Sequence, residues 1–110
     1  MIHDLKILPQ YFDAILSGDK TFEVRSIKDR TFNLGDTLRL REWHYSAYIA
    51  GANGGYSGRE ISVQVTYILP GIAYKGDEAV VMGIFLLKER DEFAKKAIGD
   101  FRDDIQVRGQ

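Results

Sequence analysis

The first part of the chain changes from a strand-like to a helix-like spacing of apolar side chains. Over residues 2–8, His3, Leu5 and Ile7 alternate with mostly polar neighbours, which is typical of a strand. After Pro9, a residue suited to the first turn of a helix, apolar side chains recur three and four residues apart until a glycine that can cap the helix. The pattern predicts a strand and then a short helix that packs on a sheet.

Strict alternation over residues 20–25 predicts a second strand with two different faces. Phe22 and Val24 share the apolar face, whereas Glu23 and Arg25 share the polar face. We expect the apolar face to point inward and the polar face to meet solvent.

Three more strands are predicted, over residues 38–43, 61–69 and 79–87. In the first of these, Leu38 and Leu40 point inward and the arginines beside them point outward. The second alternates and is expected to end at a Pro-Gly pair. The third is apolar almost throughout, which is typical of a strand buried on both faces.

Two loops and a charged C-terminal segment complete the prediction. A glycine- and tyrosine-rich connection spans residues 44–60, and a second loop lies at residues 74–76. Residues 88–110 carry many charges, with apolar residues at four-residue spacing, so part of this segment is expected to be helical and to pack on the barrel or on a second subunit. The predicted fold class is α+β: one domain over residues 1–87, a partly closed, mostly antiparallel β-barrel with its helix over one end.

The composition narrows the function classes. The chain has 110 residues, of which 45% are hydrophobic and 28% charged, and a formal net charge of -1. These values are typical of a folded single domain that does not attract phosphate backbones through its overall charge. We expect a soluble, cytoplasmic protein without membrane contacts, present as a monomer or a weak dimer.

Neither a metal nor a cofactor is expected. The chain contains no cysteine, which excludes disulfides, thiolate metal sites and cysteine nucleophiles. His3 and His44 are far apart in the sequence and have no carboxylate at metal-ligand spacing. No glycine-rich stretch continues into the lysine and helix of a phosphate-binding loop.

A cluster of charged residues follows the predicted helix. Gly18 begins a turn, Lys20 stands where the strand starts, and Glu23 and Arg25 lie on one strand face. Such a cluster offers one acceptor and two cationic donors to a small polar ligand such as a nucleobase edge or a phosphate. The alternative is a solvent-facing row of ion pairs, which is common on polar strand faces.

This cluster carries a resemblance to a known superfamily. Gly18-x-Lys20-x-x-Glu23-x-Arg25 is similar to the G-x-K-x-x-E-x-R motif of ASCH domains, the PUA-like β-barrels named after activating signal cointegrator homology. Within that superfamily the chain resembles the DUF3850 group of small bacterial and phage proteins over residues 2 to about 86. The resembling blocks are His3-x-Leu5-Lys6-Ile7-Leu8-Pro9, Tyr11-Phe12, Asp29-Arg30-x-Phe32, Gly35-Asp36-x-Leu38, Glu42-Trp43, Tyr56-x-Gly58-Arg59 and Val80-x-x-Gly83-Ile84.

The resemblance implies a PUA-like pseudo-barrel that binds RNA or a modified nucleoside in a cleft between the helix and the motif strand. Lys20, Glu23 and Arg25 would line that cleft. An arginine can bind a phosphate or a guanine edge through two donors, and a glutamate can accept from a base amino group.

The strand over residues 38–43 adds candidates for the same ligand. Trp43 and Tyr45 could stack on a base, although a place in the core or at the barrel rim accounts equally well for the tryptophan. Arg39 and Arg41 could meet backbone phosphates. The leading hypothesis is therefore an RNA- or nucleotide-binding module.

Two alternative functions stay open. A related branch of the superfamily is similar to a bacterial acetylcytidine amidohydrolase; Lys20 matches its motif lysine, but Glu23 stands where its threonine would be. Thr21, on the same strand face, is the candidate substitute, so a hydrolase of acylated nucleosides would use Lys20, Thr21 and Glu23. The other alternative is a phage or mobile-element protein that contacts a partner through the long loop or the charged C-terminal segment.

Overall fold

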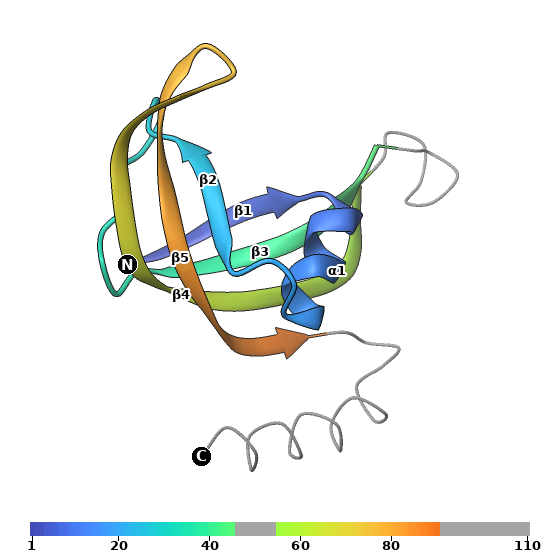
Figure 1. Ribbon diagram of the computed structural model, residues 1–110. Coiled ribbons are helices and arrows are strands. Elements are labelled where there is room, and N and C mark those ends of the chain that lie inside the picture. The colour runs from blue at the N-terminus through green and yellow to red at the C-terminus, as the bar shows by residue number, and fades with distance from the viewer. Residues whose placement is uncertain (46–54, 91–110) are drawn as a thin grey trace.

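Five strands form one curled sheet, with a helix against one end (Figure 1). The computed structural model describes residues 1–45 and 55–90. The elements are β1 (Ile2–Ile7), α1 (Pro9–Ser17), β2 (Phe22–Ser26), β3 (Thr37–His44), β4 (Gly55–Tyr74) and β5 (Asp77–Arg90). In the described residues the fold is thus a mostly-β half-barrel with one short N-terminal helix.

The strand order is β1-β3-β4-β5-β2, so β1 and β2 are the two edges of the sheet. β1 pairs with β3 in parallel, and the other pairings are antiparallel. Because the sheet curls through 212°, its two edges come to face each other. A hydrogen bond connects the two edges: Arg25 Nη2 of β2 donates to the Lys6 carbonyl oxygen of β1 at 2.9 Å.

The predicted helix is confirmed as α1. Pro9 occupies its first turn after Leu8 in an extended conformation. Gly18 ends the helix with a φ of 88°, a left-handed conformation that a residue without a Cβ adopts readily, and its N–H donates to the Ile15 carbonyl at 3.1 Å. The face that carries Phe12 and Ile15 is buried, so α1 closes one end of the core.

The core lies inside the curl. The inward positions predicted for Leu38 and Leu40 are confirmed, and both side chains are fully buried. The other members of the buried cluster come from β1, α1, β4, β5 and the segment between β2 and β3: Ile7, Phe12, Ile15, Phe32, Ile61, Val63, Val65, Val80 and Met82. Burial of these apolar side chains is the main stabilising contribution in a chain without disulfides.

β4 is longer than predicted at both ends. It begins at Gly55, so residues 55–60 belong to a strand and not to the expected loop. In this part of the strand Tyr56 pairs with Trp43, and the two rings meet edge to face with their centroids 5.0 Å apart. The strand also continues past Pro70, because this residue lies at a register shift between Leu69 and Ile72 where a missing N–H is tolerated.

The predicted second loop is a tight turn between β4 and β5, from Tyr74 to Asp77. β5 departs from the prediction of a strand buried on both faces. Ala79, Val80 and Met82 are buried, but Phe85 is 62% exposed, because beyond Met82 the outer face of the strand is open in the described part of the molecule.

Three predictions concern residues that the structure describes only in part. Residues 46–54 of the expected long connection and residues 91–110 of the charged C-terminal segment lie outside the described residues, whereas residues 88–90 end β5. The predicted helical character of that segment therefore stays a prediction. Within residues 1–45 and 55–90, no helix has the length and apolar character needed to cross a membrane.

Candidate ligand-binding pocket

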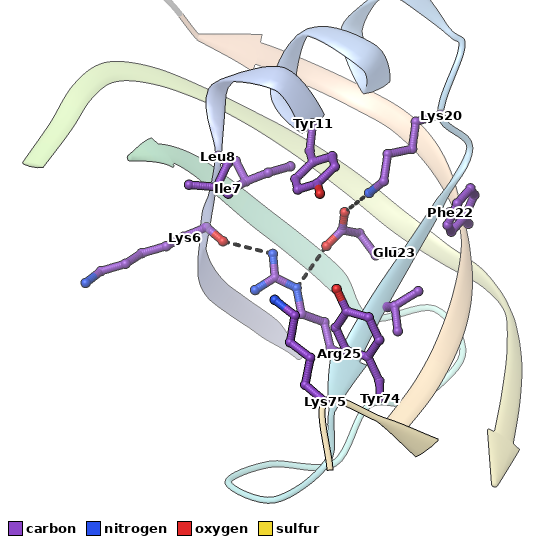
Figure 2. A pocket seen from close by; sticks show the side chains of 11 residues that line it. Lys6, Ile7, Leu8, Tyr11, Lys20, Phe22, Glu23, Arg25, Tyr74 and Lys75 are labelled. Atoms are coloured by element: carbon purple, nitrogen blue, oxygen red, sulfur yellow. Dashed lines mark hydrogen bonds and ion pairs between the residues drawn. The ribbon is translucent and has the colours of Figure 1, made fainter. Parts of the chain in front are cut away.

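A pocket of about 410 Å³ lies between the two facing edges of the sheet, beside α1 (Figure 2). We call it the edge pocket. Its walls come from the end of β1, the helix, Lys20 ahead of β2, β2 itself and the β4–β5 turn. Its lining residues are Lys6, Ile7, Leu8, Tyr11, Lys20, Phe22, Glu23, Val24, Arg25, Tyr74 and Lys75.

Glu23 stands at the centre of the edge pocket and corrects the predicted faces of the second strand. Its side chain is buried, with 3% of the residue exposed, whereas Phe22 on the opposite face is 45% exposed. The expectation that the polar face of this strand meets solvent is therefore wrong. β2 is an edge strand whose inner face turns toward the facing edge of the sheet, so the polar side chains point inward.

Two cations hold the Glu23 carboxylate. Lys20 Nζ donates to Oε1, and Arg25 Nε donates to Oε2 at 2.8 Å. Burial of a lone carboxylate is costly, and two charge-assisted hydrogen bonds offset that cost. The three motif residues therefore converge in one pocket and are also paired with one another, which combines the two interpretations that the sequence left open.

Arg25 is anchored at two points. Besides Glu23, it donates through Nη2 to the Lys6 carbonyl on the facing edge strand. These contacts use two of the five N–H donors of a guanidinium group, which leaves the fork able to serve a further acceptor in the pocket.

The glycine of the motif places Lys20. After the left-handed turn at Gly18, the backbone N–H of Lys20 donates to the Ala14 carbonyl of α1 at 2.9 Å, which keeps the chain against the helix. The Lys20 ammonium then lies 5.3 Å from the Tyr11 ring centroid and 5.2 Å from that of Phe22. An ammonium between two rings is favourably placed for cation–π attraction.

The edge pocket concentrates positive charge. Its lining contains four cationic side chains, from Lys6, Lys20, Arg25 and Lys75, and one carboxylate, from Glu23. The Lys6 ammonium, however, lies over the Trp43 ring, so Lys20, Arg25 and Lys75 against Glu23 leave a formal charge of +2 in the pocket, in a chain whose net charge is -1. The pocket is a local attractor for an anion.

Trp43 and Tyr45 lie in an adjoining cavity of about 230 Å³, which we call the Trp43 hollow. Its lining also includes Lys6, Ile7 and Leu8, which line the edge pocket as well. The Lys6 ammonium lies 3.9 Å from the centroid of the Trp43 ring. Both predicted aromatic residues thus line a cavity that shares the end of β1 with the pocket of the motif residues.

The other predicted residues of β3 point elsewhere. Arg39 pairs with both carboxylate oxygens of Asp4 and lowers the pKa of that carboxyl. Arg41 lies over the Tyr56 ring at 3.8 Å and close to Glu60. Neither arginine belongs to the lining of either cavity.

Thr21, the candidate nucleophile of the hydrolase alternative, is exposed and is not part of the pocket lining. Its carbonyl accepts from the Ile84 N–H of β5 at 3.0 Å. The structure brings Lys20 and Glu23 together without this threonine.

The sequence interpretation missed Tyr11, Tyr74, Lys75 and Lys6 as lining residues. Tyr11 belongs to one of the resembling blocks, but its place in the predicted helix did not indicate that it faces a pocket. Tyr74 and Lys75 carried no signal beyond their place in a short loop, because only the curl of the sheet brings the β4–β5 turn to the edge pocket.

A second buried carboxylate, Glu42, lies on β3 and serves packing. It accepts from Ser57 Oγ at 2.6 Å and lies 3.5 Å from Arg59 Nη1, which in turn pairs with Asp13 of α1. Within residues 1–45 and 55–90, no group of three or more histidines or carboxylates is arranged to hold a metal ion.

Two comparisons relate the chain to known proteins. Residues 2–84 match the model of a family described as a domain of unknown function, DUF3850, and this range includes every lining residue of both cavities. Over 65 residues the chain is 38% identical to an Escherichia phage P2 protein described as an uncharacterised 12.9 kDa protein in the GpA 3′ region. That match covers 59% of this chain and 51% of the phage protein, so the chain spans about half the length of this curated relative.

Proposed function

The chain belongs to the DUF3850 family, and we propose that it is a binding module that holds a nucleotide or a nucleotide-like anion in the edge pocket. The observation that carries the proposal is the buried Glu23 carboxylate between Lys20 and Arg25 in a pocket lined by an excess of cations. This arrangement offers both a phosphate and a base amino group a charged partner.

The anionic part of the ligand would meet Arg25 and the lysines. An arginine fork binds a phosphate through two parallel hydrogen bonds, and lysines add point charges around it. Lys75 lies on the β4–β5 turn, lines the edge pocket and is drawn beside Arg25 in Figure 2.

The base would meet Glu23 and the aromatic rings. A carboxylate accepts from the amino group of cytosine, adenine or guanine, and Tyr11 and Tyr74 present rings on opposite sides of the Glu23 side chain (Figure 2). The volume of about 410 Å³ falls within the usual range of small-ligand sites, so one nucleotide is a suitable size.

The motif resemblance supports the same proposal. The edge pocket lies between α1 and the motif strand β2, where the ASCH resemblance implies a cleft, and we take the half-barrel to be of the PUA-like type. Because Thr21 does not line the pocket, we place binding ahead of hydrolysis.

Substitution of Arg25 tests the proposal. Isothermal titration with the four ribonucleoside 5′-monophosphates should show binding by the wild-type chain. We expect Arg25→Lys to weaken it about tenfold, because the charge is kept and the two-donor fork is lost. Arg25→Ala should weaken it further.

Arg39→Ala is the matched control, since Arg39 is an ion-paired arginine outside both cavities. It should bind like the wild type. The proposal would be refuted if the wild type bound none of the four nucleotides, or if Arg25→Ala bound them as tightly as the wild type does.

Glu23→Gln tests the assigned role of the carboxylate. A glutamine amide can pair with either an amino group or a carbonyl, so the variant should lose preference for CMP over UMP. We expect the ratio of the two affinities to fall about tenfold, while inorganic phosphate binds more tightly because a negative charge is removed. An unchanged ratio would remove Glu23 from base recognition.

A further inference from the structure

We infer that the edge pocket is one of two subsites for a single-stranded nucleic acid of at least two nucleotides, and that the second base stacks on Trp43. The inference rests on the proposed function and adds the length and strandedness of the ligand. It comes from the adjacency of two cavities that share one stretch of backbone.

The two cavities meet at the end of β1. Lys6, Ile7 and Leu8 line both, and the chain there is extended as it leaves the strand for α1. A ligand that fills both cavities must therefore cross this segment. At about 230 Å³, below the usual range of small-ligand sites, the Trp43 hollow suits one base better than a whole nucleotide.

The Trp43 ring has the setting of a stacking platform. Tyr56 of β4 meets it edge to face, with ring centroids 5.0 Å apart and an interplanar angle of 80°, which fixes the ring orientation. One ring face carries the Lys6 ammonium at 3.9 Å. A stacked base is worth more than an exposed cation–π contact, so a base can take the place of the ammonium.

Lys6 then acquires a second position at the junction. Its side chain points away from Glu23 in the structure, toward the Trp43 side of β1 (Figure 2). An ammonium displaced from the ring stays beside Ile7 and Leu8, where the phosphate that links the two nucleotides would pass. The same lysine therefore covers the platform when the site is empty and pairs with the linking phosphate when it is filled.

The chain has one tryptophan, so tryptophan fluorescence reports on the Trp43 hollow alone. We titrate CMP and the 5′-phosphorylated dinucleotide pCpC, called CpC below, which carries one phosphate for the edge pocket and one linking phosphate for Lys6. The dinucleotide should bind at least about tenfold more tightly than CMP. The dinucleotide should quench the Trp43 emission. CMP, at concentrations that saturate the edge pocket, should leave it nearly unchanged.

Trp43→Leu removes the stacking ring of the second subsite. Because this variant has no tryptophan fluorescence, its affinities are measured by calorimetry. We expect its affinity for CpC to fall to that for CMP, with CMP binding retained. Tyr67→Leu, an aromatic residue that is 66% exposed on β4 outside both cavities, is the matched control and should change neither affinity. Tyr45→Ser, at a position that is 79% exposed, should weaken CpC selectively even if the Trp43 variant fails to fold.

The outcomes separate the two ideas. Equal affinities for CMP and CpC without quenching would overturn the two-subsite inference and leave the proposed function standing. Absence of binding by both ligands would overturn both.

Discussion

At the scale of single residues, buried carboxylates hold groups of polar side chains together in this chain. Glu23 links Lys20 to Arg25 inside the edge pocket, and Glu42 links β3 to Ser57 of β4. Asp36 has three partners: His3 Nε2 lies 2.8 Å from Oδ2, the Asn33 N–H donates to Oδ2 at 2.9 Å, and the terminal amino group donates to Oδ1 at 3.2 Å. The last carboxylate therefore pins the start of β1 beside the start of β3.

The ionised form of Asp36 is expected to stabilise the fold above about pH 4. The hydrogen bond from His3, then that from the Asn33 N–H, lowers the pKa of Asp36 from 3.8 to about 2. Because the folded-state pKa is the lower one, this contribution is complete above the unfolded value and is lost as the pH falls from about 4 to about 2.

Asp36→Asn should reduce the free energy of unfolding at pH 7 by about 2 kcal/mol, within the range for hydrogen bonds to charged groups. Urea denaturation of wild type and variant across pH 2 to 7 measures the difference in free energy of unfolding. This difference should shrink as the pH falls from about 4 to about 2. Asp29→Asn, at an exposed carboxylate, should match the wild type throughout. A constant difference down to pH 2 would contradict this account.

At the scale of elements, the β4–β5 hairpin is both a structural and a binding element. Its turn places Lys75 at a φ of 52° and Gly76 at a φ of 82°, two successive left-handed residues that suit the twist of a two-residue hairpin. The turn carries Tyr74 and Lys75 to the edge pocket. Its geometry is therefore coupled to the shape of the proposed site.

Two substitutions in the turn separate conformation from charge. Gly76→Ala meets no neighbouring atom, so its cost arises from the left-handed backbone alone, and we expect a loss of about 1 kcal/mol in stability.

Lys75→Asn should keep or raise stability, since asparagine tolerates this conformation, yet weaken nucleotide binding by removing a pocket cation. Thermal unfolding and calorimetric titration measure the two effects. A Lys75→Asn variant that binds like the wild type would exclude the turn from recognition.

On the scale of the whole molecule, charge is segregated. The net charge is -1, yet Lys20, Arg25 and Lys75 against Glu23 give the edge pocket a formal charge of +2, so the attraction for an anion is local. On β3, Arg39 is paired with Asp4, and Arg41 lies beside Glu60. These two arginines therefore do not extend the basic region along the strand. The described surface therefore favours a short ligand over a long phosphate backbone.

This segregation predicts a shallow salt dependence of binding. Each neutralised phosphate of a single strand contributes a slope of about -0.7 to the logarithm of affinity against the logarithm of salt concentration. A dinucleotide should thus show a slope of roughly -0.7 to -1.4 for one or two phosphates. Titrations of a dinucleotide and of a longer oligonucleotide in increasing KCl measure it. A slope that steepens steadily with length would indicate a long basic track.

Local patterns in the sequence were sufficient for the elements and for the motif. The helix from Pro9 to Gly18, the inward Leu38 and Leu40, and the convergence of Lys20, Glu23 and Arg25 on one candidate site all depend on spacings of a few residues. Such spacings follow from backbone geometry and from the conformations that proline and glycine favour, so they can be deduced without a partner strand.

The closure of the sheet decided the rest. Alternation in β2 separates two faces but does not say which one turns inward, and only the approach of β2 to β1 makes the Glu23 face the buried one. The same curl brings the β4–β5 turn to the edge pocket and sets Trp43 beside Lys6. The sequence by itself therefore determined which strands and charged groups exist. The direction in which those groups point, and the residues that they contact, depend on interactions between residues far apart in the chain, which no local pattern contains.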